Sequence, residues 1–452
     1  MSTRTLTSAR PATAWASPTN SDPRNLNMTL LNRTGLALAA LTLCTGLQAS
    51  ETDHYVLEKA VQVSRHGVRS PTDTDKLVKA TGRAWTPWLV QDGELTGHGY
   101  LAASYMGAWQ AAYYREAGLL ASGCPQPGSL VAVASPKQRT RSTAAALLDG
   151  MFPGCGEKAL ARTQPDPLFQ TDEMPFAKLD PAMAKAQILQ ALGGNLQAAQ
   201  ERLRPDLERL KNAVCEVGKA CPFFDTPWVL KEGDGGRFKI KGLDKASSMA
   251  ETIRLQYSEG MPLADVAFGH ARDAAQVSAL GRLHRAKYDF INDTPYIASR
   301  GGSQLMNQIV LALEQGTPME KNDPLGNPPA ARLLMLVAHD TNISHLRTML
   351  GFTWQLGEYQ PGNIPPTGTL AFERYRDTQT GERFVRTRFI TQGMDQIRAL
   401  QRLSPEHPPL QADFDQPGCR HTSVGTLCPM AQFVERTGRA IDRSALTAYR
   451  YP

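Results

Sequence analysis

Residues 64–72 read Ser-Arg-His-Gly-Val-Arg-Ser-Pro-Thr and place one histidine between two arginines. The positive charges of Arg65 and Arg69 disfavour a protonated ring on His66 and attract an anion. Guanidinium groups match the oxygens of a phosphate bidentately, and a neutral histidine held among them can act as a nucleophile. This segment therefore predicts a site for a phosphorylated substrate.

Two further segments offer side chains that complete such a site. Residues 135–140 (Ser-Pro-Lys-Gln-Arg-Thr) contain Arg139, and residues 337–342 (Val-Ala-His-Asp-Thr-Asn) contain His339 and Asp340. A carboxylic acid beside a histidine can protonate a leaving oxygen. No two histidines have the HxxxH type of spacing that is typical of zinc sites. The combined set predicts hydrolysis of a phosphomonoester through a phosphohistidine, without a metal or other cofactor.

Each of these segments follows a predicted buried strand. The three strands cover residues 55–64, 129–134 and 331–338. Ligands of open α/β sheets bind beyond the carboxyl ends of the strands, so the three segments should meet at one edge of the sheet. Two later strands, over 369–374 and 383–392, should complete it.

Helical periodicity fills most of the remaining chain. Helices are predicted beside the strands at 95–120, 141–151 and 342–350, and in the middle of the chain at 181–192, 195–214, 245–259 and 274–291. Pro205 should break or kink the second of the middle helices.

This order of elements predicts an α/β fold, with a mostly parallel central sheet flanked by helices and an inserted, mainly α-helical smaller domain. The catalytic core should comprise residues 50–165 and 300–452. The inserted domain should comprise residues 166–299 and select the substrate.

Composition excludes several classes of protein. The 452 residues are 41% hydrophobic and 20% charged, as in globular proteins. The net charge of +6 is dispersed, and the first 49 residues hold four arginines and one aspartate. We therefore expect no nucleic-acid partner. We also expect a monomer with no membrane span in the mature chain.

The first 49 residues resemble a leader. Residues 28–49 combine a basic residue, an apolar core and a small-residue cleavage site, which is typical of a signal peptide. Residues 1–27 are polar and are interpreted as an upstream extension. A lipoprotein modified at Cys44 is the alternative, although Leu43 precedes that cysteine where a small residue is usual. Export predicts a periplasmic or secreted protein.

Six cysteines remain after the leader, and an even number in an exported chain indicates disulfides. Fifteen pairings are compatible with six cysteines. Proximity in the sequence favours Cys124–Cys155, Cys215–Cys221 and Cys419–Cys428.

The segments RHGVRSPT and AHDTN resemble the two signatures of the histidine acid phosphatases, in the branch that contains bacterial periplasmic phytases and glucose-1-phosphatases. The similarity extends over essentially all of the mature chain and includes QRTRST, LQYSEGMP and CPMAQF. The resemblance implies that His66 is the nucleophile and Asp340 the proton donor. It also implies that Arg65, Arg69, Arg139 and His339 bind the phosphoryl group, assisted by Thr72 and Thr341.

The same resemblance implies that the chain binds a small phosphate monoester, an inositol phosphate or a sugar phosphate, and it suggests residues for the rest of that substrate. His284 stands where related phytases have a substrate-contacting histidine, although a core or surface role is the alternative. Glu251 and Ser248 could line an outer pocket. Asp73 stands where phytases of this branch often have lysine, and a carboxylate there would repel a polyphosphorylated substrate.

Three alternatives to a phytase-like or broad acid phosphatase stay open. The first is a glucose-1-phosphatase-type enzyme, although Gly67-Val68 and Asp340-Thr341 resemble the phytase branch. The second is a phosphoglycerate-mutase-like phosphotransferase, which the predicted leader and disulfides disfavour. The third is a secreted anion-binding protein without turnover, which would need neither a nucleophile nor an acid.

Overall fold

The computed structural model describes residues 54–452. The predicted upstream extension and signal peptide, with Cys44, lie outside the described residues. Within 54–452 no helix has both the length and the apolar character that crossing a membrane requires.

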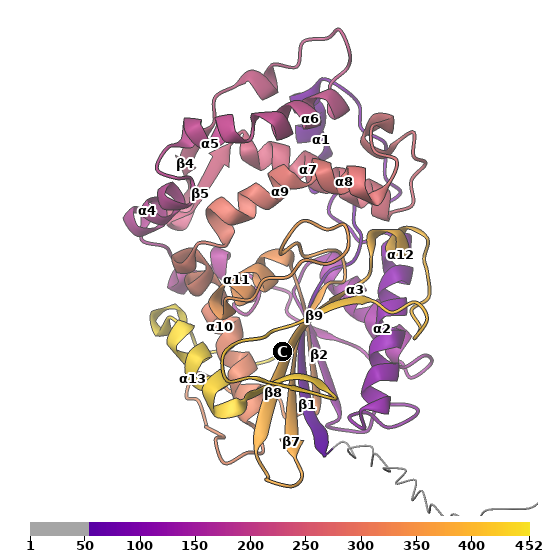
Figure 1. The fold of residues 1–452 in the computed structure, drawn as a ribbon, viewed down its shortest axis with the longest axis vertical. Helices are drawn as coiled ribbons and strands as arrows, with labels where there is room; N and C mark the ends of the chain where they lie inside the picture. The colour runs from indigo at the N-terminus through magenta and orange to yellow at the C-terminus, as the bar shows by residue number, and fades with distance from the viewer. Residues whose placement is uncertain (1–53) are drawn as a thin grey trace, which may run out of the picture. The chain divides into compact units, whose positions relative to one another are not determined.

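A nine-stranded sheet forms the centre of this part of the chain (Figure 1). Its strand order is β10-β11-β8-β7-β1-β6-β2-β3, with β9 paired to β8. The strands are β1 (Tyr55–Arg65), β2 (Leu130–Ala134), β3 (Leu160–Ala161), β6 (Leu333–Ala338), β7 (Thr369–Asp377), β8 (Arg383–Thr391), β9 (Leu410–Asp413), β10 (Arg420–Thr422) and β11 (Gly425–Pro429).

The sheet is parallel in one half and antiparallel in the other. Strands β1, β6, β2 and β3 pair in parallel, as predicted. From β7 onward every pairing is antiparallel, which departs from the prediction of a mostly parallel sheet. The reason is local, because only five residues separate β7 from β8 and such a short turn can only join antiparallel strands. The predicted α/β class is confirmed.

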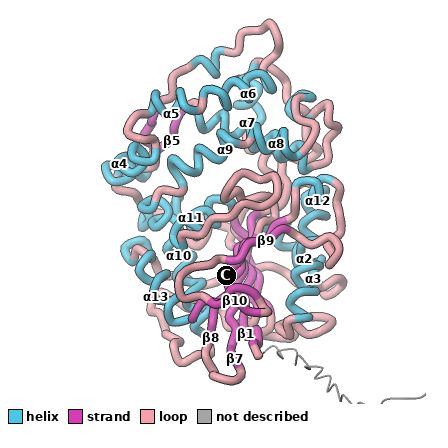
Figure 2. The backbone as a smooth tube through the Cα atoms, viewed as in Figure 1, coloured by secondary structure: helices cyan, strands magenta, loops and turns pink. Residues whose placement is uncertain are grey.

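Helices cover both faces of the sheet, because successive residues of its strands point to opposite sides. In β6, Leu334 and Leu336 face one apolar cluster, and Leu333 and Met335 face another. The first cluster is completed by α10 (Pro295–Glu314), α11 (Asp340–Leu350) and α13 (Met430–Ala440), and the second by α2 (Gly97–Glu116) and α3 (Gln138–Met151). Figure 2 shows the strands between these two groups of helices.

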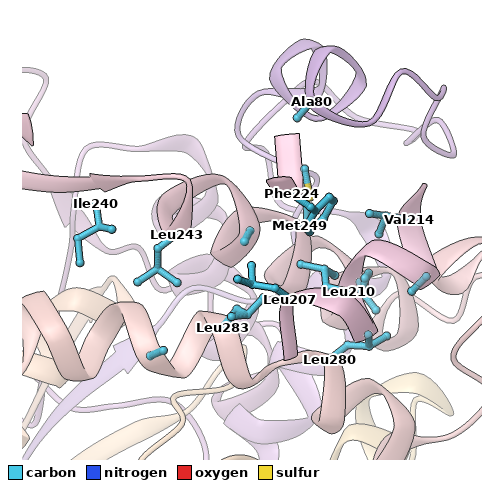
Figure 3. Close-up of a cluster of buried hydrophobic side chains, with 14 of the residues drawn as sticks. Ala80, Leu207, Leu210, Val214, Phe224, Ile240, Leu243, Met249, Leu280 and Leu283 are labelled. Carbon is cyan, nitrogen blue, oxygen red and sulfur yellow. The ribbon is translucent and has the colours of Figure 1, made fainter. Parts of the chain in front are cut away.

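A block of helices lies beyond one end of the sheet (Figure 1). It contains α1 (Thr74–Thr81), α4 (Pro181–Ala191), α5 (Leu196–Arg202), α6 (Arg204–Val214), α7 (Leu243–Ser258), α8 (Ala274–Leu280), α9 (Arg282–Lys287) and the hairpin β4 (Val229–Glu232) and β5 (Phe238–Lys241). The block has its own apolar core, in which Leu210 and Leu243 are fully buried (Figure 3). Burial of each such side chain stabilises the fold by about 2 kcal/mol.

Several predicted elements differ from the observed ones. The helix predicted over 274–291 is divided into α8, α9 and a π-helix (Tyr288–Asn292), with Gly281 as the C-cap of α8. The helix predicted over 195–214 breaks at Leu203, just before Pro205, as expected. Helix α10, the hairpin β4–β5, strands β9 to β11, α12 (Met394–Arg398) and α13 were not predicted.

The three disulfide pairings are confirmed. Cys124–Cys155, Cys215–Cys221 and Cys419–Cys428 are all present. The first ties the loop after α2 to the loop after α3, and the third joins β10 to β11. Each closes a loop of the chain and so restricts the unfolded state.

Candidate active site

The three predicted segments meet because the strand ends that precede them are aligned. Arg65 at the end of β1 pairs with Ala338 at the end of β6. The backbone N–H of His66 donates to the Ala338 carbonyl (3.1 Å), and that of Ser135 donates to the Val337 carbonyl (2.9 Å). The carboxyl ends of the three strands therefore lie side by side at one edge of the sheet, as predicted.

Two helices begin at this edge of the sheet. Helix α3 begins at Gln138, directly after the loop that follows β2, and α11 begins at Asp340, directly after β6. The N-terminus of a helix carries unpaired N–H groups and a partial positive charge, both of which favour a bound anion. The helices therefore add to the positive potential of the arginines.

The ring of His66 is held in one tautomer. Its Nδ1 lies 2.9 Å from the carbonyl oxygen of Gly67, which can only accept a hydrogen bond, so Nδ1 carries the proton. Burial, with the positive charges of Arg65 and Arg139, lowers the pKa of His66 well below its usual range. The Nε2 lone pair is therefore free to attack an electrophile even at acidic pH.

Glycine is required at position 67 by a close approach of α2. A Cβ there would lie 2.9 Å from Leu95 Cδ1 and 3.0 Å from the carbonyl oxygen of Gly99. The Gly67 N–H donates to Thr143 Oγ1 (2.9 Å) of α3. The backbone beside His66 is thus fixed by both helices on that face of the sheet.

His339 lies beside the ring of His66 and contacts Arg139. The two imidazole rings are 5.7 Å apart, edge to face. Arg139 Nη2 lies 3.5 Å from His339 Nδ1, and Ser135 Oγ lies 2.9 Å from His339 Nε2. Because a guanidinium can only donate, the proton of the neutral ring is on Nε2. Burial and Arg139 lower the pKa of His339 to about 3.

Three arginines of the candidate site each have a buried Nε donor. Arg65 is fully buried, and Arg69 and Arg139 are partly buried. Among the described residues, the Nε atom of each has no hydrogen-bond partner. Buried donors are normally satisfied, so the arrangement favours an oxyanion ligand.

Arg65 also links two carboxylates. Its Nη2 lies 3.0 Å from Asp340 Oδ2 and 2.5 Å from Glu251 Oε1, and its Nη1 donates to the Ile364 carbonyl (2.6 Å). Burial alone would raise the pKa of Asp340, but Arg65 and His66 lower it well below the usual range. Without a bound anion, Asp340 is therefore ionised at pH 5.

Glu251 joins the helical block to Arg65 at the end of β1. Besides Arg65 it pairs with Arg254 (2.6 Å), and its Oε2 lies 3.7 Å from His284 Nε2. Its side chain is 7% exposed. These contacts bring His284 to the site, which supports the predicted role over a surface role. Ser248, by contrast, is exposed and bonds only within α7, while its neighbour Ser247 contacts His284 Nδ1 (3.1 Å).

We predict that Glu251→Gln lowers the free energy of unfolding by about 3 kcal/mol, because it leaves the buried Arg254 without its carboxylate and Arg65 with Asp340 alone. Chemical denaturation at pH 7 measures the change, and added inorganic phosphate should restore part of it. Glu201→Gln, in the exposed pair with Arg204, is the matched control and should be nearly neutral. A Glu251 variant as stable as the wild type would contradict this role.

We predict that His284 makes stability fall in acid. Burial lowers the pKa of His284 to about 4, against the opposing attraction of Glu251. The unfolded chain takes up this proton near pH 6.5, so about 3 kcal/mol of stability is present above that pH and is lost as the pH falls to about 4. His284→Asn should make the free energy of unfolding depend less on pH between about 4 and 6.5. His421→Asn, at a side chain that is 77% exposed, should leave that dependence unchanged. An unchanged slope in His284→Asn would refute the assignment.

The donor atoms of Glu251, His284 and Asp340 lie within 4.8 Å of one another. Their types are those of metal ligands. However, Arg65 and Arg254 already compensate the carboxylates at 2.5 to 3.0 Å, and two guanidinium groups at that range repel a cation. The arrangement suits an anion better than a metal ion.

The remaining predicted residues lie at the edge of the site. Thr72 is exposed, in the loop before α1. Asp73 is the N-cap of α1: its Oδ1 accepts the N–H of Lys76 (2.9 Å), and its carboxylate pairs with the Lys76 ammonium group. Thr341 lies in the first turn of α11, and its N–H donates to Asp340 Oδ1 (3.0 Å).

Comparison with known proteins identifies the family. The model of the histidine phosphatase superfamily (branch 2) matches residues 56–389. Phytase AppA of Escherichia coli (strain K12) is 30% identical over 401 residues, covering 85% of this chain and 92% of that protein. A glucose-1-phosphatase of Salmonella typhimurium (strain LT2) is 28% identical over 87% of this chain and 95% of its own length.

A solved structure agrees with these relatives. The phytase of Klebsiella sp ASR1 superposes with a TM-score of 0.82 at 43% identity, and the match covers 87% of this chain and 98% of that one. Fold and sequence thus lead to the same family. The chain belongs to the histidine phosphatase superfamily (branch 2).

Proposed function

We propose that this phosphomonoesterase is a phytase-like acid phosphatase that works through a phosphohistidine on His66. The family and its relatives support hydrolysis of phosphate monoesters. The observation that carries the proposed mechanism is the tautomer of His66, whose Nε2 lone pair is free while Arg65, Arg69 and Arg139 surround it. Simple binding of an anion would require no such nucleophile.

In the first step, Nε2 of His66 attacks the phosphorus atom. The N–P bond forms as the bond between phosphorus and the leaving alkoxide oxygen breaks, and Asp340 gives that oxygen a proton. Arg65, Arg69, Arg139 and His339 hold the nonbridging oxygens and stabilise the charge that builds on them.

In the second step, water attacks the phosphorus of the phosphohistidine. The Asp340 carboxylate accepts a proton from that water, the N–P bond breaks and inorganic phosphate forms. The chain returns to a neutral His66 and a protonated Asp340, which loses its proton when phosphate leaves.

The low pKa of Asp340 is compatible with its role as an acid because the substrate changes the charge of the site. At pH 5 a phosphate monoester is mainly a monoanion, since its second pKa is about 6. Its negative charge offsets the field of Arg65, which holds Asp340 ionised in the free protein. The proton that arrives on the substrate can therefore move to Asp340 and then to the leaving oxygen.

A small pocket at Glu251 adjoins the proposed phosphate site. Val277 and Met394 line it together with Arg254, His284 and Asn363. The polar groups among them can bind the hydroxyl groups of a sugar or an inositol. We accordingly propose that the helical block over 166–299 selects the substrate, although α10 crosses the predicted boundary at residue 299.

Asp73 does not exclude an inositol polyphosphate. Its carboxylate caps α1 and pairs with Lys76, so its charge is partly neutralised within the protein. We therefore favour phytate over glucose-1-phosphate as the preferred substrate. We also propose a monomer exported to the periplasm or the medium, a location that the three disulfides support.

Phosphate release at about pH 5, measured with a chelator present, tests this function. Phytate, glucose-1-phosphate and p-nitrophenyl phosphate should be compared side by side. We expect turnover of all three, with the highest kcat/KM on phytate. Activity limited to the two small esters would move the enzyme to the sugar-phosphatase class, and loss of activity with the chelator would contradict a metal-free mechanism.

A further inference from the structure

The peptide group between His66 and Gly67 is held at both ends by threonines to which the mechanism above gives no role. Its carbonyl oxygen accepts the backbone N–H of Thr367 (3.2 Å), and its N–H donates to Thr143 Oγ1 (2.9 Å). His66 and both threonines are at most 2% exposed. Buried backbone groups are normally hydrogen-bonded, so loss of either contact would leave one end of this peptide group unpaired.

Thr367 makes its contact from a strained backbone conformation. Its φ is 61°, and within 54–452 it is the one β-branched residue with a positive φ. Residues 365–368 form a tight turn in which the Gly368 N–H donates to the Pro365 carbonyl (3.0 Å), and a positive φ at the third position of such a turn normally selects glycine. Strained residues persist only where the surrounding structure holds them in place, and they cluster at active sites.

Two further contacts hold this turn in place. The hydroxyl of Thr367 can donate to the Pro366 carbonyl (2.6 Å) or to Gln392 Oε1 (3.1 Å). The Gly368 carbonyl accepts the backbone N–H of Arg65 (2.9 Å). The turn is therefore tied to the end of β1, directly before the proposed nucleophile.

Thr143 makes the other contact from α3. Its hydroxyl accepts the Gly67 N–H and donates its own proton to the Arg139 carbonyl (2.6 Å), one helical turn earlier. This second bond fixes the orientation of the hydroxyl. The carbonyl oxygen of Gly67 is in turn the acceptor that keeps the proton on Nδ1 of His66 (2.9 Å). Thr143 thus holds the residue that sets the tautomer of the ring.

We infer that Thr143 and Thr367 are positioning residues for His66: they hold the His66–Gly67 peptide group at both ends and so direct Nε2 at the phosphorus atom of the substrate. The inference rests on the proposed function, because it requires His66 to be the nucleophile. The two contacts act on His66 and not on Asp340. Their loss should therefore slow the attack by Nε2 equally for good and poor leaving groups.

Thr143→Val tests the first contact, because it keeps the shape of the side chain and removes the hydroxyl. We expect kcat/KM to fall about tenfold on both glucose-1-phosphate and p-nitrophenyl phosphate, since misplacing a reacting group has effects of at least this size. Thr143→Ser keeps the hydroxyl and should stay within about twofold of the wild type. Thr437→Val is the matched control, since it removes a buried hydroxyl of α13 that donates to the Phe433 carbonyl (2.7 Å), and it should leave both values unchanged.

Phosphate binding separates misalignment of His66 from a general loss of structure. Isothermal titration of inorganic phosphate into Thr143→Val should give a Kd within about twofold of the wild type, because the arginines of the site remain in place. Phosphate binding that weakens as much as activity would overturn the inference. So would full activity in Thr143→Val, a loss confined to glucose-1-phosphate, or a serine variant as impaired as the valine variant.

Thr367→Val and Thr367→Gly test the second contact as a pair. Valine lacks the hydroxyl and disfavours a positive φ, so it should withdraw the N–H from the His66 carbonyl and lower kcat/KM about tenfold on both substrates. Glycine adopts a positive φ freely and keeps the N–H, so Thr367→Gly should stay within about twofold of the wild type. An equal loss in both variants, or no loss in Thr367→Val, would overturn the inference. If Thr367→Val does not fold, the Thr143 variants decide alone.

His66→Ala, measured in parallel, separates the inference from the proposed function. If His66→Ala is inactive while Thr143→Val and Thr367→Val are as active as the wild type, only the inference fails. If His66→Ala keeps its activity, the proposed nucleophile fails as well.

Discussion

Replacing His66 by alanine should abolish phosphate release and leave phosphate binding measurable. The reason is that Nε2 of His66 is the atom proposed to form the N–P bond, while Arg65, Arg69, Arg139 and His339, which would hold the phosphoryl group, remain in place. Loss of a covalent nucleophile costs about 10⁴-fold or more in kcat. Phosphate release from phytate, with isothermal titration of inorganic phosphate, measures both parts of the prediction.

The matched control for His66→Ala is His407→Ala, which removes an exposed ring in the loop before β9. It should retain full activity. Residual activity of His66→Ala above about one per cent of the wild type would show that another group attacks the phosphorus. Loss of phosphate binding together with activity would instead indicate that the imidazole is needed mainly to shape the site.

Replacing Asp340 by asparagine should reduce activity by an amount that depends on the leaving group. Phytate and glucose-1-phosphate release alkoxides, so we expect losses of about 10² to 10⁴-fold in kcat, the usual range for a general acid. With p-nitrophenyl phosphate the first step needs little protonation, so the loss should be at least tenfold smaller. Steady-state kinetics on the three substrates measure this difference.

Asparagine keeps the shape of the side chain but also weakens its attraction to Arg65. Stability must therefore be measured in parallel, and Asp395→Asn is a suitable control because Asp395 accepts a hydrogen bond from Tyr257 (2.5 Å) at the C-terminal end of α7. Asp395→Asn should not distinguish between leaving groups. Equal losses on all three substrates in Asp340→Asn would remove Asp340 from the role of acid.

The sequence predicts which edge of the sheet carries the candidate site, because each of the three site segments directly follows a predicted strand. The apolar runs before His66, Ser135 and His339 predict parallel strands, and parallel strands end at the same edge of a sheet. The observed register, with Arg65 beside Ala338, confirms this reasoning. Residue type then limited the chemistry, because arginines around an unprotonated histidine suit a phosphoryl group.

The contact between Glu251 and Arg65 could not be predicted in the same way. The two residues are 186 positions apart, and they meet only because the helical block folds over the end of the sheet. An acidic residue in an amphipathic helix normally lies in solvent, so the sequence of α7 gave little indication of a buried ion pair.

The antiparallel half of the sheet was also only partly predictable. Strands β7 and β8 have strong strand patterns, but β9, β10 and β11 have five residues or fewer and acquire their pairing from β8 and the disulfide Cys419–Cys428. Short segments with few apolar residues carry too little periodicity to be recognised. Their position depends on tertiary contacts.

The charges of the site explain how it can remain folded without substrate. Arg65 and Arg254 are compensated by Glu251 and Asp340, while His66, His284 and His339 stay neutral because burial and the guanidinium groups lower their pKa values. Binding of a phosphate monoester adds negative charge among these groups. The same charge that satisfies the arginines would allow Asp340 to hold a proton, so substrate binding and acid catalysis are coupled.

The most direct test of the mechanism is to trap the covalent intermediate. The wild-type protein should be mixed with ³²P-labelled substrate at about pH 5, quenched within milliseconds in alkali and digested for mass spectrometry. We predict a phosphate that is stable in alkali, labile in acid and attached to the peptide that contains His66. Turnover with no protein-bound phosphate at any quench time, or phosphate on another residue, would contradict the phosphohistidine mechanism.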